Sequence, residues 1–336
     1  MVTPVLASWA ALTAVSAGLS GALILVLKPI LARHLLAHPN ARSSHKAATP
    51  QGAGLAVMAA LLAVCGSAIL LGVAVPPPSL IPILAGAAVL TVIGALDDVH
   101  ALAVSWRLFA QALVAFAIVF LLPPDFRILP DLLPAMVERV LLALGVIGFI
   151  NAVNFLDGLD WMTVVQVVPI TLGVAVLCNL DLVPSTVGFL ALALLGATLG
   201  FAVFNKHPAQ IFLGDAGSLP IGLVLAYLLL YVAEAHIVSA ILMALYTLTD
   251  SIVTFSRRLL AGEKVFEAHR AHFYQRAVAN GMNVPQVTAR IFWLGLWLAC
   301  LAIAAALART YTFDITALLL GLAGTGLVLF NFARGR

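Results

Sequence analysis

Long apolar stretches, separated by short polar connections, make up most of the chain. A stretch of roughly 20 apolar residues can cross a bilayer as a helix, so the pattern predicts an all-α, polytopic integral membrane protein. We expect about eleven (ten or eleven) transmembrane helices in a single membrane-embedded domain over residues 1–336. The expected spans are about 4–27, 53–75, 79–96, 107–122, 137–155, 162–178, 185–204, 216–233, 236–256, 287–308 and 312–331.

The composition supports this class. Apolar residues make up 63% of the chain and charged residues 9%, against about 25% charged in soluble domains. These values exclude a soluble globular protein, a disordered chain and a nucleic-acid partner. The first apolar run, Val5 to Leu27, follows no basic segment and is long enough to span, so we do not expect a signal peptide.

Basic residues predict the orientation. If the connections alternate between the two sides of the membrane, fourteen of the seventeen lysines and arginines fall on one side. That side is expected to be cytoplasmic. The N-terminus is then outside and the C-terminus is cytoplasmic. The exceptions are Arg127, Arg139 and Arg309. Five patterned polar segments all fall on the cytoplasmic side.

Two of these segments are acidic. Asp97 and Asp98 end the third span. Adjacent helical residues point about 100° apart, so the two carboxylates should face different partners, and a local cation should offset their clash with the helix dipole. In segment 151–160, Asn-x-x-Asn-x-x-Asp-Gly-x-Asp, the spacing would lay oxygen-bearing side chains along one helical stripe, with a break at Gly158. Such oxygens suit Mg²⁺ or Mn²⁺.

The other three segments suggest anion binding. Residues 212–218, Phe-Leu-Gly-Asp-Ala-Gly-Ser, resemble a helix N-terminus whose N–H groups favour a phosphate, although an ordinary N-cap would read the same way. Residues 269–276, His-Arg-Ala-His-Phe-Tyr-Gln-Arg, could clamp a diphosphate or lie on anionic lipid. The loop 38–54 could receive a lipid head group or be a plain positive-inside loop. Together the five segments indicate phosphoryl transfer from a water-soluble donor to a lipid phosphate.

With these motifs, the chain resembles the polyprenyl-phosphate N-acetylhexosamine-1-phosphate transferases, or glycosyltransferase family 4, over about residues 20–310. The loop 269–276 is similar to that of members initiating O-antigen-type glycans and unlike the three-histidine loop of the peptidoglycan enzyme. The resemblance implies a Mg²⁺-dependent (or Mn²⁺-dependent) enzyme of the bacterial inner membrane, with a cytoplasmic active site. It would transfer HexNAc-1-phosphate from a UDP-HexNAc to undecaprenyl phosphate and release UMP, initiating a cell-surface glycan such as O-antigen.

The resemblance also implies roles for single residues. Asn154 and Asp215 match metal ligands, and Asp97, Asp98, Asp157 and Arg107 match catalytic residues. The residues that match substrate-binding positions are Asp160 and Phe212 near the uracil, His269, Arg270, His272 and Arg276 over the diphosphate-sugar, and Ser43, Ser44, His45 and Thr49 near the lipid phosphate.

Three positions depart from the family pattern. Trp161 stands where Gly is usual, Gln51 where Arg is common and Ala53 where Gly is common. A bulky Trp161 beside the nucleotide could alter donor choice. Two other readings stay open. One is a phospho-N-acetylmuramoyl-pentapeptide transferase-like enzyme. The other is a cation-coupled transporter, for which Asp250 would be the deep acid. Whether the protein forms a homodimer in the membrane lipid is also open.

Overall fold

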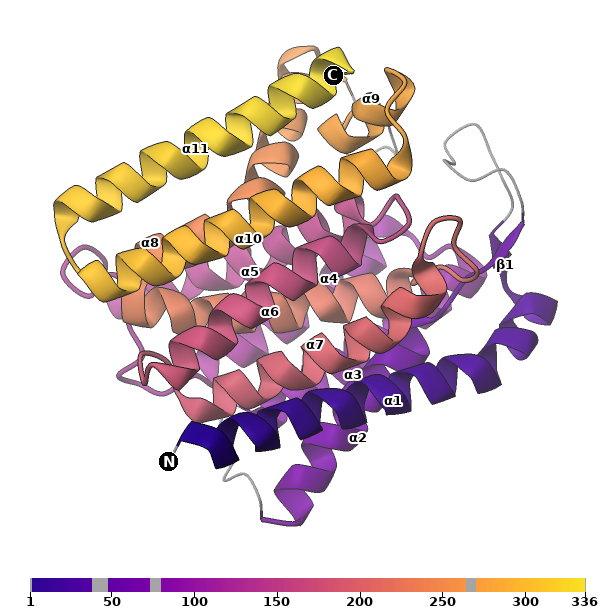
Figure 1. The fold of residues 1–336 in the computed structure, drawn as a ribbon, viewed down its shortest axis with the longest axis horizontal. Coiled ribbons are helices and arrows are strands. Elements are labelled where there is room, and N and C mark those ends of the chain that lie inside the picture. Colours follow the sequence, from indigo (N-terminus) through magenta and orange to yellow (C-terminus); the bar gives the residue numbers. More distant parts are fainter. Residues whose placement is uncertain (1, 38–47, 73–79, 264–269, 336) are drawn as a thin grey trace.

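The computed structural model describes residues 2–37, 48–72, 80–263 and 270–335, and these residues form a helical bundle (Figure 1). The helices are α1 (Val2–His34), α2 (Gly54–Leu70), α3 (Leu80–His100), α4 (Val104–Phe120), α5 (Ala135–Leu156), α6 (Met162–Asn179), α7 (Ser185–Asn205), α8 (Asp215–Leu260), α9 (Phe273–Ala279), α10 (Val284–Ala308) and α11 (Tyr311–Arg334). Two short strands, β1 (Leu36–Ala37) and β2 (Thr49–Pro50), pair antiparallel. The all-α expectation is confirmed.

Within the described residues, eight helices are long and apolar enough to cross a membrane. The shorter helices α2 and α4 are also apolar. Helix α8 contains both the eighth and the ninth expected spans. The two spans meet at a kink, where a single residue, His236 (φ −162°, ψ 100°), has an extended backbone. Each of the eleven expected apolar segments is therefore mainly helical over its described residues, and the chain is a multi-pass membrane protein.

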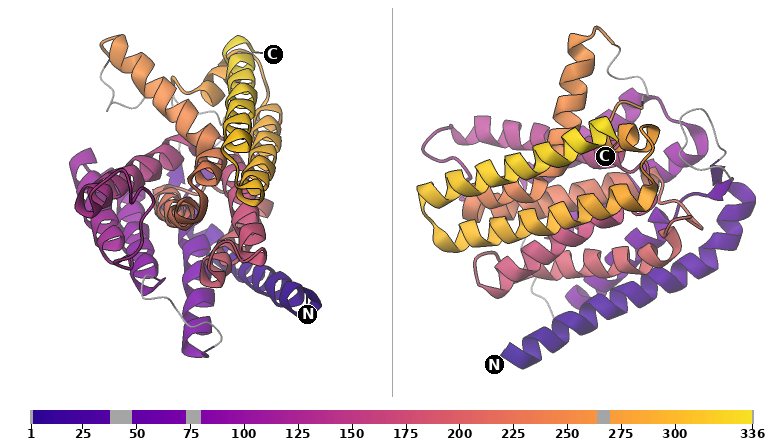
Figure 2. Two further views of the ribbon diagram at one scale, coloured as in Figure 1. Left: turned by 90° about the vertical axis from the view of Figure 1, so that its left-hand side faces the viewer. Right: turned by 45° about the horizontal axis from the view of Figure 1, so that its top comes forward.

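The first part of α8 lies at the centre of the bundle, where it packs against α3 and α5 (Figure 2). Its side chains from Ala216 to Val232 are all buried. A helix that is apolar all round is expected to be enclosed by other helices. The last turns of α8 instead project from the bundle, with Phe255 and Leu260 exposed.

The two ends of the bundle differ in chemistry. The acidic end, as we call it, carries Asp98, Asp157 and Asp215. The chain reaches the opposite end at His236, whose Nε2 lies 3.3 Å from Asp314 Oδ1 at the start of α11. The C-terminus lies at the acidic end, beside α9, and the N-terminus lies at the opposite end (Figure 1).

Two of the three basic residues that break the predicted charge asymmetry have internal partners at the opposite end. Arg139 is 9% exposed, and its guanidinium donates to backbone carbonyls at the end of α4 and beyond, including those of Val119 and Pro123. Arg127 Nε donates to Glu138 Oε2 at 2.5 Å. These arginines stabilise a turn, so their place in the sequence does not report membrane orientation.

Replacing Arg139 with methionine is expected to destabilise the protein by about 2–4 kcal/mol, because buried carbonyls at the end of α4 would lose charged donors. The melting temperature in detergent measures this loss. Arg309→Met is the control, since Arg309 is exposed and its guanidinium makes one long hydrogen bond, to the Ala306 carbonyl at 3.4 Å, among the described residues. Equal losses in the two variants would contradict the assignment.

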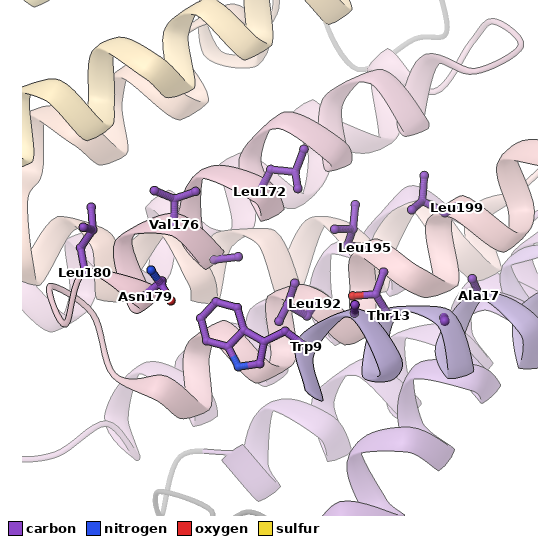
Figure 3. Close-up of a pocket in the computed structure, with 13 residues that line it drawn as sticks. Trp9, Thr13, Ala17, Leu172, Val176, Asn179, Leu180, Leu192, Leu195 and Leu199 are labelled. Carbon is purple, nitrogen blue, oxygen red and sulfur yellow. The ribbon is translucent and has the colours of Figure 1, made fainter. Parts of the chain in front are cut away.

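A separate apolar groove of about 600 Å³ lies between α1, α6 and α7. Figure 3 shows Trp9, Leu172, Asn179 and Leu195 around it. None of the predicted site residues lines this groove. The candidate active site must therefore be sought at the acidic end.

Candidate active site

The carboxylate of Asp98 caps the N-terminus of α8. The backbone N–H groups of Asp215 and Ala216 donate to its two oxygens at 2.9 and 3.1 Å. Gly94 permits this approach, because a Cβ there would lie 2.1 Å from the Asp215 carbonyl oxygen. The helix start is confirmed. The expectation of free N–H groups for a phosphate is wrong, because Asp98 already supplies the anion that this helix end favours.

Asp97 faces a different partner from its neighbour, as predicted. Its Oδ2 accepts from Arg107 Nη1 at 2.7 Å, and its Oδ1 accepts from the Leu102 N–H at 2.6 Å. The same Arg107 nitrogen lies 3.1 Å from Asp215 Oδ2. Arg107 is therefore the cation that the acidic pair required, and it bridges two acids that are far apart in sequence.

Asn154 joins α5 to the start of α8. Its side-chain nitrogen donates to Asp215 Oδ1 at 2.9 Å and to Ser218 Oγ at 2.8 Å. The nitrogen and oxygen of an amide are assigned from the hydrogen-bond network and can exchange places by a 180° flip. Such a flip of Asn154 would place its oxygen beside the Asp215 carboxylate. In that orientation Asn154 and Asp215 would offer two neighbouring oxygens, the ligand type that Mg²⁺ prefers.

This donor set fits a cation that is shared with substrate. Among the described residues, no group of three or more His, Cys, Asp or Glu side chains could hold a metal ion. Mg²⁺ usually takes one or two carboxylates, waters and substrate phosphates and has no full protein cage. Asn154 and Asp215 are therefore sufficient as protein ligands only if a phosphate completes the coordination.

The expected oxygen stripe along segment 151–160 is wrong, because α5 ends at Leu156. Asn151 turns away and donates to Gln111 Oε1 on α4 at 2.6 Å. Asp157 lies just after the helix and accepts a hydrogen bond from the Thr163 hydroxyl. Of these side chains, Asn154 alone is hydrogen-bonded to Asp215.

Burial raises the pKa of Asp157 to about 8, even though the Thr163 hydrogen bond lowers it, and the charges of Asp215, Asp98 and Asp160 raise it further. Asp157 therefore binds a proton at neutral pH unless a cation lies beside it. An acidic cluster of this kind favours a bound cation.

Asp160 is held by the loop between α7 and α8. His207 Nδ1 lies 2.6 Å from Asp160 Oδ2, and the Ala209 N–H donates to the same oxygen at 3.0 Å. The carboxylate thus fixes that loop at the acidic end. Its proximity to a uracil stays a prediction.

The loop before α2 also reaches the site. Gln51 Nε2 donates to Asp98 Oδ1 at 2.6 Å. The N–H groups of Gly52 and Ala53 donate to the Phe212 carbonyl at 3.1 and 3.0 Å, so Phe212 anchors this loop through its backbone. Thr49 is buried in β2. Ser43, Ser44 and His45 lie outside the described residues.

The His-Arg segment is only partly as expected. His272 is 4% exposed, and its Nδ1 lies 3.1 Å from Asp250 Oδ1. This corrects its expected place over a diphosphate. Arg276 stacks over the Phe273 ring at 5.5 Å, and Arg270 is exposed. His269 lies outside the described residues.

Trp161 is the N-cap residue of α6, and its backbone is left-handed, with φ 65°. This conformation suits glycine, which accounts for the residue usual there in the resembled family. The indole N–H donates to the Ala202 carbonyl and the backbone N–H to Asn205 Oδ1, both at 2.7 Å. Trp161 therefore holds the loop of residues 157–161 against α7 by two hydrogen bonds.

Trp161→Phe is expected to lower the melting temperature by a few degrees, because one hydrogen bond is lost (about 1 kcal/mol). If the protein uses UDP-sugar donors, as the family resemblance implies, the ratio of kcat/KM between two such donors should stay unchanged. A change of tenfold or more in that ratio would show instead that the indole contacts the donor.

Several partners were missed by sequence reasoning. Thr163 and His207 carry no local signal, because each is identified only by the carboxylate that it meets. Gln51 was noted as a departure without a role. Asp250 offered a signal, since a lone acid in an apolar run needs a partner.

The fold and this geometry define a class: a multi-pass membrane protein with acids and Arg107 gathered at a buried helix start. The family model described as Glycosyl transferase family 4 matches residues 80–233, from α3 into α8. Over this segment, which is a little under half of the chain, the protein is similar to that family.

Two relatives are similar to this chain. One, from Bacillus subtilis (strain 168), is named "Probable undecaprenyl-phosphate N-acetylglucosaminyl 1-phosphate transferase" and is 29% identical over 289 residues, covering 81% of this chain and 79% of the relative. The other, from Aquifex aeolicus (strain VF5), is named "Phospho-N-acetylmuramoyl-pentapeptide-transferase". It is 33% identical over 174 residues, which are 47% of this chain and 48% of the relative.

Proposed function

We propose that this protein transfers a HexNAc-1-phosphate from a UDP-sugar to undecaprenyl phosphate, releasing UMP and forming an undecaprenyl diphosphate-sugar. The observation that carries the proposal is the hydrogen-bonded group of Asp98, Asn154, Asp215 and Arg107 at the start of α8. The match to the family model and the names of both relatives support a sugar-1-phosphate transferase acting on polyprenyl phosphate.

Asn154 and Asp215 would hold Mg²⁺, with Mn²⁺ as a substitute. When bound, the metal would neutralise the donor diphosphate and the charge that develops on it. Asp98 keeps the start of α8 in place through two backbone N–H groups. Arg107, held by Asp97, presents a guanidinium that is 26% exposed and can contact a phosphate.

The acceptor needs little activation. The second pKa of a phosphomonoester is about 6, so the lipid phosphate is mostly dianionic at neutral pH. Asp97 and Asp98 therefore act by positioning and charge, without removing a proton from the nucleophile. The loop ending at Gln51, which includes Ser43, Ser44, His45 and Thr49, would receive this phosphate.

The donor nucleotide would lie near Asp160 and Phe212, with His269 and Arg270 over the diphosphate. We assign the site to the cytoplasmic face of a bacterial inner membrane, because fourteen basic residues fall on that side. UDP-GlcNAc is the first donor to test, given the Bacillus relative's name. Initiation of O-antigen is favoured over the peptidoglycan reaction by the loop 269–276.

A transporter is disfavoured by the same contacts. Asp250, the deep acid it would use, is 0% exposed and bonded to His272 and the Phe273 N–H beside α9. This carboxylate lies at the start of α9 and is also hydrogen-bonded to the hydroxyls of Thr254 and Tyr246.

The test is UMP release by purified protein in detergent, with undecaprenyl phosphate, Mg²⁺ and a panel of UDP-HexNAc donors. We expect release that requires the lipid phosphate and stops with EDTA. Release without lipid phosphate, or no release with any donor from folded protein, would contradict the proposal.

A further inference from the structure

Helix α9 is fixed to the bundle by a buried carboxylate. Asp250, on the second part of α8, accepts from the Phe273 N–H and lies beside His272 Nδ1, both at 3.1 Å. The Thr254 hydroxyl donates to the same oxygen at 3.1 Å. Because the carboxylate binds both the cap and the first residue of α9, the position of α9 relative to α8 is set by side-chain contacts.

The next residue, Tyr274, reaches from α9 to the end of α5. Its hydroxyl donates to the Phe155 carbonyl at 3.0 Å, and the side chain is 1% exposed. Phe155 lies in the last turn of α5, where carbonyls have no partner within the helix. The bond thus satisfies a helix end that lies between Asn154 and Asp157 in the sequence.

The hydroxyl also occupies the space beside Gly158. A Cβ at residue 158 would lie 2.1 Å from Tyr274 Oη, and 3.0 and 3.2 Å from the ring atoms Cζ and Cε2. No real Cβ tolerates the first distance, whereas the other two are tight contacts that a small shift relieves. Gly158 and Tyr274 therefore form a complementary pair, and the clash belongs mainly to one oxygen atom.

We propose that Tyr274 is a positioning residue for the transferase site: it fixes the end of α5 and the Gly158 turn, and so places Asn154 and Asp157. The kinetic part of this inference rests on the proposed function. The contact itself does not, because it predicts coupling between two residues 116 positions apart whatever the substrate.

The experiment compares four proteins: wild type, Gly158→Ala, Tyr274→Phe and the double variant. Displacements near 1 Å can cost about 10²-fold in rate. We expect Gly158→Ala to lower kcat by about that factor and to lower the melting temperature. Tyr274→Phe should lower kcat by about tenfold. The double variant should have a higher kcat and a higher melting temperature than Gly158→Ala, because the clashing oxygen is gone.

Two substitutions serve as matched controls. Gly148→Ala adds a methyl group to the same helix where nothing lies within 4 Å. Tyr311→Phe removes a hydroxyl from a residue that is 89% exposed. Both should leave kcat within about twofold, as expected for surface changes.

The Mg²⁺ concentration for half-maximal rate separates positioning from mere structure. We expect it to rise severalfold in Tyr274→Phe, because Asn154 is displaced, while the KM for undecaprenyl phosphate stays unchanged. A purely structural role would lower the melting temperature and leave kcat per folded protein and the Mg²⁺ requirement at wild-type values.

Additive losses in the double variant, or wild-type kcat and Mg²⁺ requirement in Tyr274→Phe, would overturn the inference. If the wild-type protein released no UMP, the proposed function would fail. The contact between Gly158 and Tyr274 would then be tested by the melting temperatures only. Rescue of Gly158→Ala by Tyr274→Phe would support it, and additive losses in melting temperature would contradict it.

Discussion

Asp215→Asn is expected to lower kcat by about 10³-fold while the protein remains folded. Asparagine has the same shape, but it removes the charge that faces Arg107 and Asn154. The loss should lie at the upper end of the 10²- to 10³-fold range typical of removing a single neutral donor, because an anionic ligand of the proposed Mg²⁺ disappears.

The measurement is UMP release over a range of Mg²⁺ concentrations. Asp181→Asn is the control: Asp181 is exposed, and its φ of 56° is one that asparagine tolerates. The control should keep full activity. If Asp215→Asn retained more than a tenth of wild-type kcat at ordinary Mg²⁺, Asp215 could not be the principal metal ligand.

Asp98→Asn is expected to lower kcat by about 10²-fold at every pH between 6 and 9. The carboxylate accepts from Gln51 and from the N–H groups of Asp215 and Ala216. An asparagine offers one acceptor oxygen, and its NH₂ would face a donor, so a buried N–H would lose its partner. The start of α8, and Asp215 with it, would shift.

The pH profile separates this account from general-base catalysis. If Asp98 mainly removed a proton from the acceptor, its loss would matter less as the acceptor ionised. Near-normal turnover of Asp98→Asn at high pH would therefore support proton transfer and contradict a positioning role. A uniform loss supports positioning.

Hydropathy was sufficient to predict the helices, and the acidic motifs predicted which side chains gather at one end of the bundle. The apolar runs located every long helix, and the acids of distant segments meet at one end, as seen for Asp98 with Asp215 and for Asn154 with Asp215. The different partners of Asp97 and Asp98 also followed from helix geometry alone.

Three details depended on tertiary contacts that local sequence does not encode. Asp98 occupies the helix start where a phosphate was expected. Its partners lie 117 and 118 residues away in the sequence, so no local pattern predicts this contact. The oxygen stripe failed because α5 ends at Leu156, which separates Asp157 from the helical face. His272 had the chemistry of a phosphate ligand, but Asp250 holds it in the core.

The fate of the donor's β-phosphate tests the central claim most directly. UDP-GlcNAc labelled with ³²P in the β-phosphate would be incubated with the protein, Mg²⁺ and undecaprenyl phosphate. The account predicts that the label moves to the lipid fraction as unlabelled UMP forms, and that Asp215→Asn and EDTA each abolish the transfer. Label that stays in water-soluble products while UMP or UDP is released would contradict transfer of a sugar phosphate to lipid.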